Sequence, residues 1–352
     1  MGHRIVLFEK EQYPFHKVCG EYISMESWEF LCRLGVDLEN LHVSRINKLE
    51  ISSANGKILR QQLPLGGFGI SRYLLDNELA KIARASGVTL IENCKVSDVS
   101  FKADFFSVEA NGRSYVASVA CGTYGKRSNL DIRWQRPFAI SKKNKLNNFI
   151  GIKYHIKTNF ATDSIALHNF KNGYCGIVKI EADKYCLCYL TTAENLRKAD
   201  GNIKLMEERI LSANPYLKKI FESSEILYDT PLSISQISFD EKKQVEDHLL
   251  MTGDAAGMIT PLCGNGMSMA MHGSKLAAEQ VNRFLNAEIN RLEMEINYRR
   301  NWKRLFARRL WIGRKIQHLF GNNTATNLLL SAGRAFPALT RYLVRQTHGK
   351  PF

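Results

Sequence analysis

Apolar residues along the chain recur at two spacings, one typical of strands and one typical of helices. The continuous run from Ile5 to Phe8 ends at Glu9. It predicts a buried parallel strand whose last residue faces a ligand crevice. A second continuous run, Leu249 to Thr252, also predicts a buried strand, and the stretch from Ile150 to Thr192 has a strand-rich pattern with alternating faces.

Asn-Gly pairs mark three points where the chain is expected to reverse between antiparallel strands. This dipeptide favours the two-residue turns of β-hairpins, because both residues tolerate a positive φ. The pairs are Asn55-Gly56, Asn111-Gly112 and Asn172-Gly173. Antiparallel sheet is therefore expected to be interleaved with the parallel strands.

Helical spacing predicts three helices in the first 290 residues. Ser71 is a suitable N-cap for the first helix, which Gly87 closes. The second helix begins at residues 206–211, and Pro215 is expected to help end it. The third helix follows the glycine-rich turn after Thr252, and its apolar residues share one face: Met269, Leu276, Ala277, Val281 and Phe284.

Composition is that of a folded protein, with 45% hydrophobic and 24% charged residues in a chain of 352. Its length suits one large domain or two intertwined domains. No window approaches the run of about 20 apolar residues that a membrane-spanning helix needs. The eight cysteines show no CxxC spacing, and no apolar targeting run stands at the start. These features favour a reducing cytoplasm and argue against a disulfide framework or a zinc site, so no metal is expected.

The net charge of +15 is concentrated at the C-terminal end, where no acidic residue follows Glu295. Two interpretations of residues 298–320 remain open, because aromatic residues alternate there with Arg and Lys. The segment is either an amphipathic helix in peripheral contact with an anionic membrane or a helix that packs its apolar face on the body of the protein. Nucleic-acid binding is not expected, since no recognition motif accompanies the basic residues. Twelve basic residues follow Glu295: Arg299, Arg300, Lys303, Arg304, Arg308, Arg309, Arg314, Lys315, Arg334, Arg341, Arg345 and Lys350.

The strongest candidate for chemistry is the glycine-rich turn between the second buried strand and the third helix. It comprises residues 252–257 and 261–267. Glycines at a strand-to-helix turn let the backbone approach a ligand, and a helix N-terminus offers unpaired N–H groups. Asp254 can accept hydrogen bonds from sugar-alcohol hydroxyls. The alternative is a tight turn that merely packs against a core helix.

This turn resembles the second FAD fingerprint, GDAAG followed by PxxGxG, of the superfamily of FAD-binding monooxygenases, geranylgeranyl reductases and flavin halogenases. In that superfamily the Asp holds the ribityl chain and the glycine turn lies along the isoalloxazine. Other motifs match in the same order: residues 6–10 resemble the strand whose terminal Glu binds the adenosine ribose, and residues 17–21 resemble the KxCGE segment near the flavin. Residues 71–76 resemble the helix start whose Arg reaches FAD. The resemblance runs from residue 4 to about residue 285.

The resemblance implies a set of FAD-binding residues. For three of them a plainer role stays open: Glu9 as a solvated strand end, Arg72 as a surface helix residue and Cys19 as a small buried hydrophobe. The set is Glu9, Lys17, Cys19, Gly20, Arg72, Gly253, Asp254, Ala255, Pro261, Gly264, Asn265, Gly266 and Met267.

Three departures from the family pattern limit what the resemblance implies. The first strand and the GxGxxG turn that seats the pyrophosphate are absent, so an N-terminally truncated FAD domain with weakened FAD affinity is expected. Residues 122–128 align with GADGxxS, but Tyr124 stands in place of the Asp, which puts that motif's cofactor role in doubt. Residues 172–179 lack the reductases' aromatic segment ending in Phe-Pro, and the halogenases' Trp-x-Trp-x-Ile-Pro is absent, which weakens prenyl-chain reduction and halogenation.

The fold class that follows is α/β, with a Rossmann-like FAD-binding domain of the aromatic-hydroxylase type. An inserted antiparallel β domain for substrate and a helical C-terminal extension complete it. We expect the FAD-binding domain to comprise residues 1–45, 70–138 and 245–288. The substrate domain is expected at residues 46–69 with 139–244, and the basic helical extension at residues 289–352.

The expected function is that of a cytoplasmic, FAD-dependent oxidoreductase that uses NAD(P)H. It resembles the monooxygenases and is expected to act on an apolar or aromatic small molecule. The alternatives are reduction of isoprenoid chains, as in geranylgeranyl reductases, and a non-catalytic truncated remnant. No catalytic acid or base is assigned. His155 and His168 fall in the β-rich layer and could face substrate, although a structural role is the expectation for each.

Overall fold

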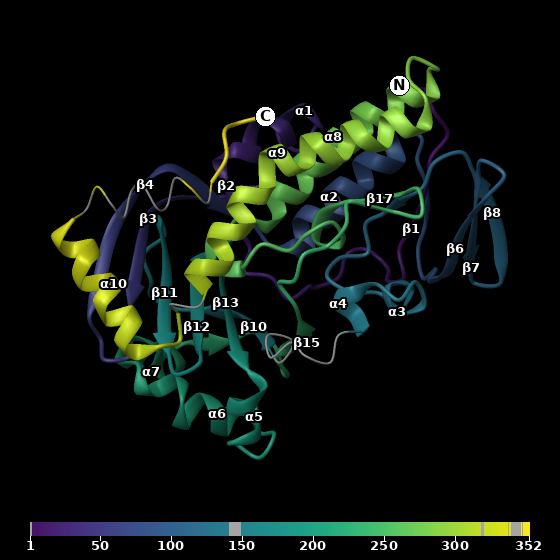
Figure 1. Cartoon of the computed structure of the whole chain (residues 1–352). Helices are drawn as coiled ribbons and strands as arrows, with labels where there is room; N and C mark the ends of the chain where they lie inside the picture. Colours follow the sequence, from purple (N-terminus) through teal and green to yellow (C-terminus); the bar gives the residue numbers. More distant parts are fainter. Residues whose placement is uncertain (1, 141–148, 318–319, 337, 339–345, 347) are drawn as a thin grey trace.

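A computed structural model describes residues 2–140, 149–317, 320–336, 338, 346 and 348–352. The largest sheet that it describes has nine strands in the order β14-β10-β13-β12-β11-β3-β4-β2, with β15 pairing beside β10 (Figure 1). Its neighbouring strands are antiparallel except for the parallel pair β11 and β3. The strands are β2 (Tyr22–Ser24), β3 (Ser44–Ser52), β4 (Ile58–Gly69), β10 (Phe149–Lys157), β11 (Ser164–Phe170), β12 (Gly173–Lys179), β13 (Tyr185–Thr192), β14 (Glu225–Ile226) and β15 (Leu232–Ile237).

Three smaller sheets complete the described strands. The first is the parallel pair β1 (Val6–Phe8) and β5 (Thr89–Ile91). The second joins β17 (Leu249–Met251) to β9 (Cys121–Gly122) in parallel and to β16 (Val245–Glu246) in antiparallel. The third is an antiparallel meander of β6 (Val96–Lys102), β7 (Phe105–Ala110) and β8 (Arg113–Ala117).

The hairpin predictions are confirmed at all three Asn-Gly pairs. The first two lie between β3 and β4 and between β7 and β8, and the third lies at the reversal from β11 to β12, where Gly173 is already the first residue of β12. At Asn111 and Gly112 the φ angles are 46° and 75°. Both residues are therefore in the left-handed region that a type I′ turn requires.

Strand β1 is parallel, as predicted, but the prediction that this first strand is buried is wrong. Ile5 and Val6 are 53% and 45% exposed. Among the described residues β1 pairs only with β5, so no neighbour covers its second edge. The second buried strand is confirmed, because all three residues of β17 are buried.

Helix α2 (Arg72–Ala85) confirms the first predicted helix, and the Ser71 hydroxyl accepts a hydrogen bond from the Leu74 amide. The prediction that Pro215 helps to end a helix is wrong. Helix α6 (Ile203–Arg209) stops earlier, and Pro215 is instead the first residue of α7 (Pro215–Ser223). Proline is well suited to that position, because the first helical N–H has no partner within the helix and the ring fixes a helical φ.

The remaining helices are mostly short segments between strands. The long ones, α8 and α9, run side by side across one end of the molecule, whereas α5, α6 and α7 lie at the other end beyond the large sheet (Figure 1). Their bounds are η1 (Met25–Ser27), α1 (Trp28–Arg33), α3 (Asn129–Arg133), α4 (Pro137–Ile140), α5 (Ala193–Arg197), η3 (Leu211–Ala213), η4 (Gly253–Ala255), η5 (Pro261–Cys263), α8 (Gly266–Leu285), α9 (Arg291–Gln317) and α10 (Asn323–Ala335).

Helix α9 packs its apolar face on the body of the protein. Tyr298, Trp302, Phe306 and Leu310 are buried in the same core as β17 and the turn that follows it. This is the second of the two interpretations left open for residues 298–320. Positions 318–319 of that segment lie outside the described residues, as do Arg341 and Arg345. Trp311, by contrast, is 56% exposed. None of the described helices is long and apolar enough to cross a membrane.

Two tryptophans of α9 provide a matched test of this packing. Trp302 is 4% exposed and Trp311 is 56% exposed, on the same helix. We expect Trp302→Ala to lower the free energy of unfolding by about 3–5 kcal/mol, because it leaves a cavity in the core. Trp311→Ala is expected to change it by no more than about 0.5 kcal/mol. Urea denaturation followed by circular dichroism measures both, and equal effects of the two substitutions would contradict the packing described.

Candidate cofactor site

The turn after β17 is held by side chains from outside it. Three consecutive carbonyl oxygens in this turn each accept a hydrogen bond from a buried side chain. The bonds run from Lys242 Nζ to Asp254 O (2.7 Å), from an Arg136 guanidinium nitrogen to Ala255 O (3.3 Å) and from Gln244 Nε2 to Ala256 O (3.1 Å). The backbone of η4 is thereby fixed, with the Asp254 side chain on its outer surface.

Arg136 reaches the turn from a buried ion pair. Its guanidinium lies 2.9 Å from the Asp131 carboxylate, and both side chains are almost fully buried. Tyr124, which stands where the family motif has Asp, donates from its hydroxyl to Asp131 (2.6 Å) and accepts from Arg136 (3.0 Å). In this structure Tyr124 therefore supports the arginine that braces the turn.

Lys242 places a positive charge beneath the same turn. Its ammonium also donates to the Lys126 carbonyl at 2.7 Å. Burial lowers the pKa of Lys242 to about 8, with the negative charges of Asp254 and Asp131 opposing that shift. At neutral pH the ammonium is therefore mostly protonated and lies beside the Asp254 backbone.

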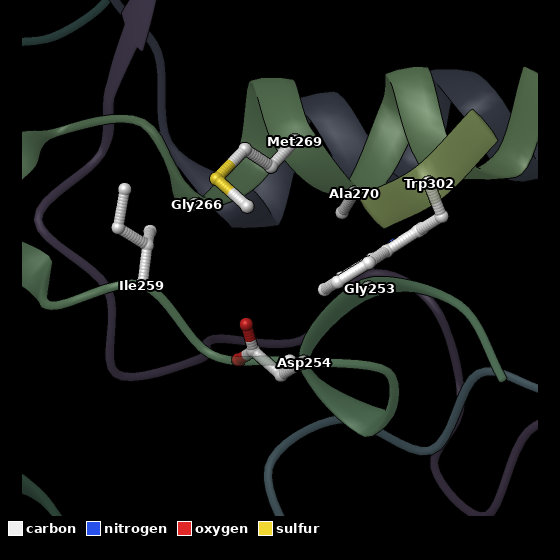
Figure 2. A pocket seen from close by; sticks show the side chains of 8 residues that line it. Gly253, Asp254, Ile259, Gly266, Met269, Ala270 and Trp302 are labelled. Atoms are coloured by element: carbon white, nitrogen blue, oxygen red, sulfur yellow. The ribbon is translucent and has the colours of Figure 1, made fainter. Parts of the chain in front are cut away.

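The Asp254 carboxylate projects into a narrow hollow between the turn and α8 (Figure 2). Burial raises its pKa, and the charges of Lys242, Arg72 and Lys126 oppose that rise. Within the described residues no hydrogen bond or ion pair engages this carboxylate. The hollow is lined by Gly253, Asp254, Gly257, Ile259, Gly266, Met269, Ala270 and Trp302.

Glycine is required at two positions around the hollow. Gly253 has φ 57° at the start of the turn, and Gly264 has φ 62° at the end of η5. A Cβ on Gly264 would lie 2.8 Å from the Tyr22 ring, which follows directly after the segment 17–21. The second fingerprint and the KxCGE-like segment therefore meet at this contact.

The residues predicted near the N-terminus form one ion network. Lys17 Nζ lies 3.0 Å from Asp76 and 3.9 Å from Glu9, and Arg72 makes two 2.7 Å bonds to Asp76. Burial raises the pKa of Asp76, but the charges of Arg72 and Lys17 outweigh it and lower the pKa overall. Tyr13 donates to Glu9 at 3.4 Å. Glu9, Lys17 and Arg72 thus lie together, with Asp76 between the two cations.

The other predicted residues occupy the loops around these two groups. Cys19 is half-buried, and burial raises the pKa of its thiol, so it is not a thiolate at neutral pH. Gly20 is exposed beside it. The rest fall on the second fingerprint: Ala255 is the buried last residue of η4, Pro261 begins η5, Asn265 is buried before α8, and Gly266 and Met267 are the first residues of α8.

The two histidines of the β-rich layer face opposite sides of the sheet. His168 stacks on Tyr216 of α7, and its Nδ1 lies 2.9 Å from the Ser52 hydroxyl. Burial lowers its pKa to about 4, as fits a neutral structural histidine. His155 instead lies against the loop that carries residues 17–21, where its Nε2 is 2.6 Å from the Glu21 carboxylate.

Several residues that shape this site are not among the predicted FAD-binding residues. Asp76 had a detectable signal, because it stands four residues after Arg72 on one helix face. Arg136, Lys242 and Gln244 had none, since each reaches the turn through tertiary packing and belongs to no local motif.

Comparison of the sequence with known proteins gives distant relatives, and no family model matches the chain. The chain is 26% identical over 306 residues to conditioned medium factor receptor 1 of Dictyostelium discoideum, a match that covers 79% of this chain and 58% of that protein. It is 30% identical over 124 residues to an uncharacterized protein of Methanocaldococcus jannaschii, covering 34% of this chain and 31% of the relative. The chain therefore spans less than two thirds of either curated relative.

Comparison of the structure gives close matches to flavoenzymes. A myxobacterial chondrochloren halogenase, described as FAD-dependent, matches with a TM-score of 0.77 and 16% identity, over 99% of this chain and 85% of its own. A flavin-dependent brominase matches with a TM-score of 0.76 and 18% identity, over 98% and 87%. A probable FAD-dependent monooxygenase of Pseudomonas aeruginosa matches with a TM-score of 0.69 and 14% identity, over 92% of each chain. The predicted fold class is therefore confirmed: the chain has the α/β fold of the FAD-dependent halogenases and monooxygenases.

Proposed function

We propose that this chain carries the cofactor and substrate regions of an FAD-dependent oxidoreductase. The observation that carries the proposal is the Asp254 carboxylate, which projects into the hollow from a braced glycine turn without a partner among the described residues. An acceptor held in this way suits the hydroxyls of a sugar alcohol. The fold shared with FAD-dependent enzymes supports the same assignment.

The residues present fit FAD in both parts of the site. Asp254 would accept hydrogen bonds from the ribityl hydroxyls, and Gly253 has the positive φ that the turn carrying this carboxylate requires. Glu9 would accept from the adenosine ribose, while Lys17 and Arg72 would supply positive charge beside the anionic cofactor. Bound FAD would accept a hydride from NAD(P)H and pass electrons to O2 or to a substrate double bond.

The loop of residues 17–21 lies against the large sheet. Side chains of the sheet bind two backbone carbonyls of this loop: Lys153 donates to Lys17 O at 3.1 Å, and the Cys186 thiol donates to Cys19 O at 3.3 Å. We propose an apolar or aromatic small molecule as substrate and monooxygenase-like chemistry. Reduction of an isoprenoid chain is the second candidate, and product analysis with and without O2 separates the two.

Removing the charge of Asp254 tests the cofactor assignment. In this protein, Asp254→Asn is expected to weaken FAD binding about tenfold to a hundredfold, because the variant loses hydrogen bonds to a charged acceptor worth about 1.5–3 kcal/mol. Asp247→Asn is the control, since Asp247 is an exposed residue of the turn between β16 and β17. Titration of the protein into FAD, followed by flavin fluorescence, gives both affinities. Equal affinities for the two variants would refute the role of Asp254.

We also propose that the outer face of α9 contacts anionic membranes. Six cations are exposed there, and among the described residues none of them has an ion-pair partner. The exposed ring of Trp311 lies on the same helix, and such rings favour the headgroup region of a bilayer. Because the apolar face of α9 is already packed in the core, this contact would depend on charge. The cations are Arg299, Arg300, Lys303, Arg304, Arg308 and Lys315.

A matched pair of triple variants tests this surface. Replacing Arg300, Arg304 and Arg308 by Gln is expected to weaken binding to vesicles of phosphatidylcholine with phosphatidylserine about a hundredfold, at about 1 kcal/mol per cation. Replacing the exposed Lys204, Lys218 and Lys219 by Gln changes the net charge equally but is expected to leave binding almost unaltered. Vesicle co-sedimentation measures both. Equal losses in the two variants, or equal binding to neutral vesicles, would exclude a specific role for α9.

A further inference from the structure

A chain of hydrogen-bonding side chains runs from the protein surface to the loop of residues 17–21. His16 Nδ1 lies 3.1 Å from the Tyr228 hydroxyl, which lies 2.8 Å from His155 Nδ1. On its other side the His155 ring reaches Glu21, with Nε2 2.6 Å from Oε2. Four side chains from three separate segments are thus joined by three consecutive hydrogen bonds.

The two ends of this chain lie in different environments. His16 is half-exposed and stacks on Tyr73 at the start of α2, with ring centroids 4.6 Å apart. His155 and Glu21 are 2% and 0% exposed. The chain therefore leads from a site that water can reach to a carboxylate that water cannot reach.

The inner end is firmly held. Besides His155, the Glu21 carboxylate accepts hydrogen bonds from the Lys153 ammonium and from the backbone amide of Arg72 at 2.8 Å. Glu21 also has a φ of 54°, which is unfavourable for a residue with a side chain. These bonds offset that cost and fix Glu21. Glu21 directly follows Gly20 and ends the segment that also carries Lys17 and Cys19.

The hydrogen-bond donors can point in only two ways. The Glu21 carboxylate only accepts, so Nε2 of His155 carries a proton. When His155 is neutral, its Nδ1 accepts from Tyr228, and Tyr228 in turn accepts from a protonated Nδ1 of His16. When His155 is an imidazolium, both bonds reverse, and Tyr228 donates to a bare Nδ1 of His16. The state of His155 therefore sets the tautomer of His16 through one hydroxyl.

We propose that His16, Tyr228, His155 and Glu21 form a proton relay between solvent and the cofactor loop. In the inward step a proton from water bonds to Nε2 of His16, and the Nδ1–H bond of His16 breaks as that proton passes to the Tyr228 oxygen. The original Tyr228 proton passes to Nδ1 of His155. One proton has then moved from water to His155, beside the Glu21 carboxylate, and no electron has been transferred.

This relay deepens the proposed function and rests on it. Electron transfer from a reduced cofactor to O2 or to a double bond is accompanied by proton uptake, and the loop of residues 17–20 is part of the proposed cofactor site. Glu21 would stabilise the imidazolium at the inner end of the relay. Other charged or titratable groups face the relay from the surrounding elements: Lys153, Glu181, Lys184 and Cys186.

The hydroxyl of Tyr228 is the one link that can be removed with little change in packing. Tyr228→Phe keeps the ring beside His16 and His155 but breaks both hydrogen bonds. Tyr154→Phe is the matched control. It lies next to His155 on β10, and its buried hydroxyl donates to Glu207 at 2.9 Å on the other side of the sheet.

Nuclear magnetic resonance of protein with ¹⁵N-labelled histidine reads the relay without cofactor. We expect His16 to carry its proton on Nδ1 while His155 is neutral and to switch to Nε2 as His155 becomes protonated. Tyr228→Phe is expected to abolish this coupling, whereas Tyr154→Phe preserves it. The proposal fails if His16 keeps one tautomer while His155 titrates, or if the coupling survives in Tyr228→Phe. Should that variant not fold, His16→Phe serves instead, because it keeps a ring beside Tyr73 but removes the outer end of the relay. Exchange of the His155 ring protons with solvent is then the readout: the relay predicts slower exchange in His16→Phe, and an unchanged exchange rate contradicts it.

The kinetics of the FAD-loaded protein give the second readout. Tyr228→Phe is expected to slow the proton-coupled half-reaction at least about tenfold and to raise its solvent isotope effect, whereas Tyr154→Phe stays within about twofold of the unmodified protein. An unchanged rate in Tyr228→Phe would overturn the relay while leaving the FAD assignment intact. Equal FAD affinities of Asp254→Asn and its control Asp247→Asn would overturn the proposed function but would not alter the histidine coupling.

Discussion

The site depends on the fixed backbone of the turn from Asp254 to Ala256. Its three carbonyls are held by Lys242, Arg136 and Gln244, each of which is buried. A hydrogen bond from a charged donor contributes about 1.5–3 kcal/mol, and a buried carbonyl left without a partner costs a comparable amount. The turn therefore has little freedom to move, and the Asp254 carboxylate is presented to the hollow in one orientation. Rigid support of this kind is what a binding group needs to hold a flexible chain such as a ribityl.

The same turn connects the candidate site to the rest of the fold. Trp302 of α9 lines the hollow, and the Tyr298 hydroxyl donates to the carbonyl of Met251 at the end of β17. Gly264, at the end of η5, packs against Tyr22, which leads to Glu21 and the hydrogen-bonded chain to His16. The basic helix, the glycine turn and the loop of residues 17–21 are consequently one packed unit. Cofactor binding on one side and proton supply on the other can act on the same loop.

Much of the fold could be predicted from local signals. The Asn-Gly hairpins, the Ser71 cap and the apolar strand of residues 249–251 were recognised because each needs only its neighbours in sequence. Pro215 was misplaced because the same residue suits both the end of one helix and the first turn of the next. The burial of β1 was misjudged because apolar composition does not reveal whether a strand has a partner on both edges. For the site, motifs predicted the groups that face the crevice, but Arg136 and Lys242 are separated from their carbonyl partners by 119 and 12 residues, and only the folded chain brings them together.

Hydrogen–deuterium exchange of the protein, with and without saturating FAD, tests the central claim most directly. The account predicts that FAD slows exchange in residues 9–21, at the start of α2 and in residues 253–267, while β6 to β8 and α5 to α7 exchange as before. Protection confined to other parts of the chain, or no protection at saturating FAD, would contradict the assignment of this turn as the cofactor site.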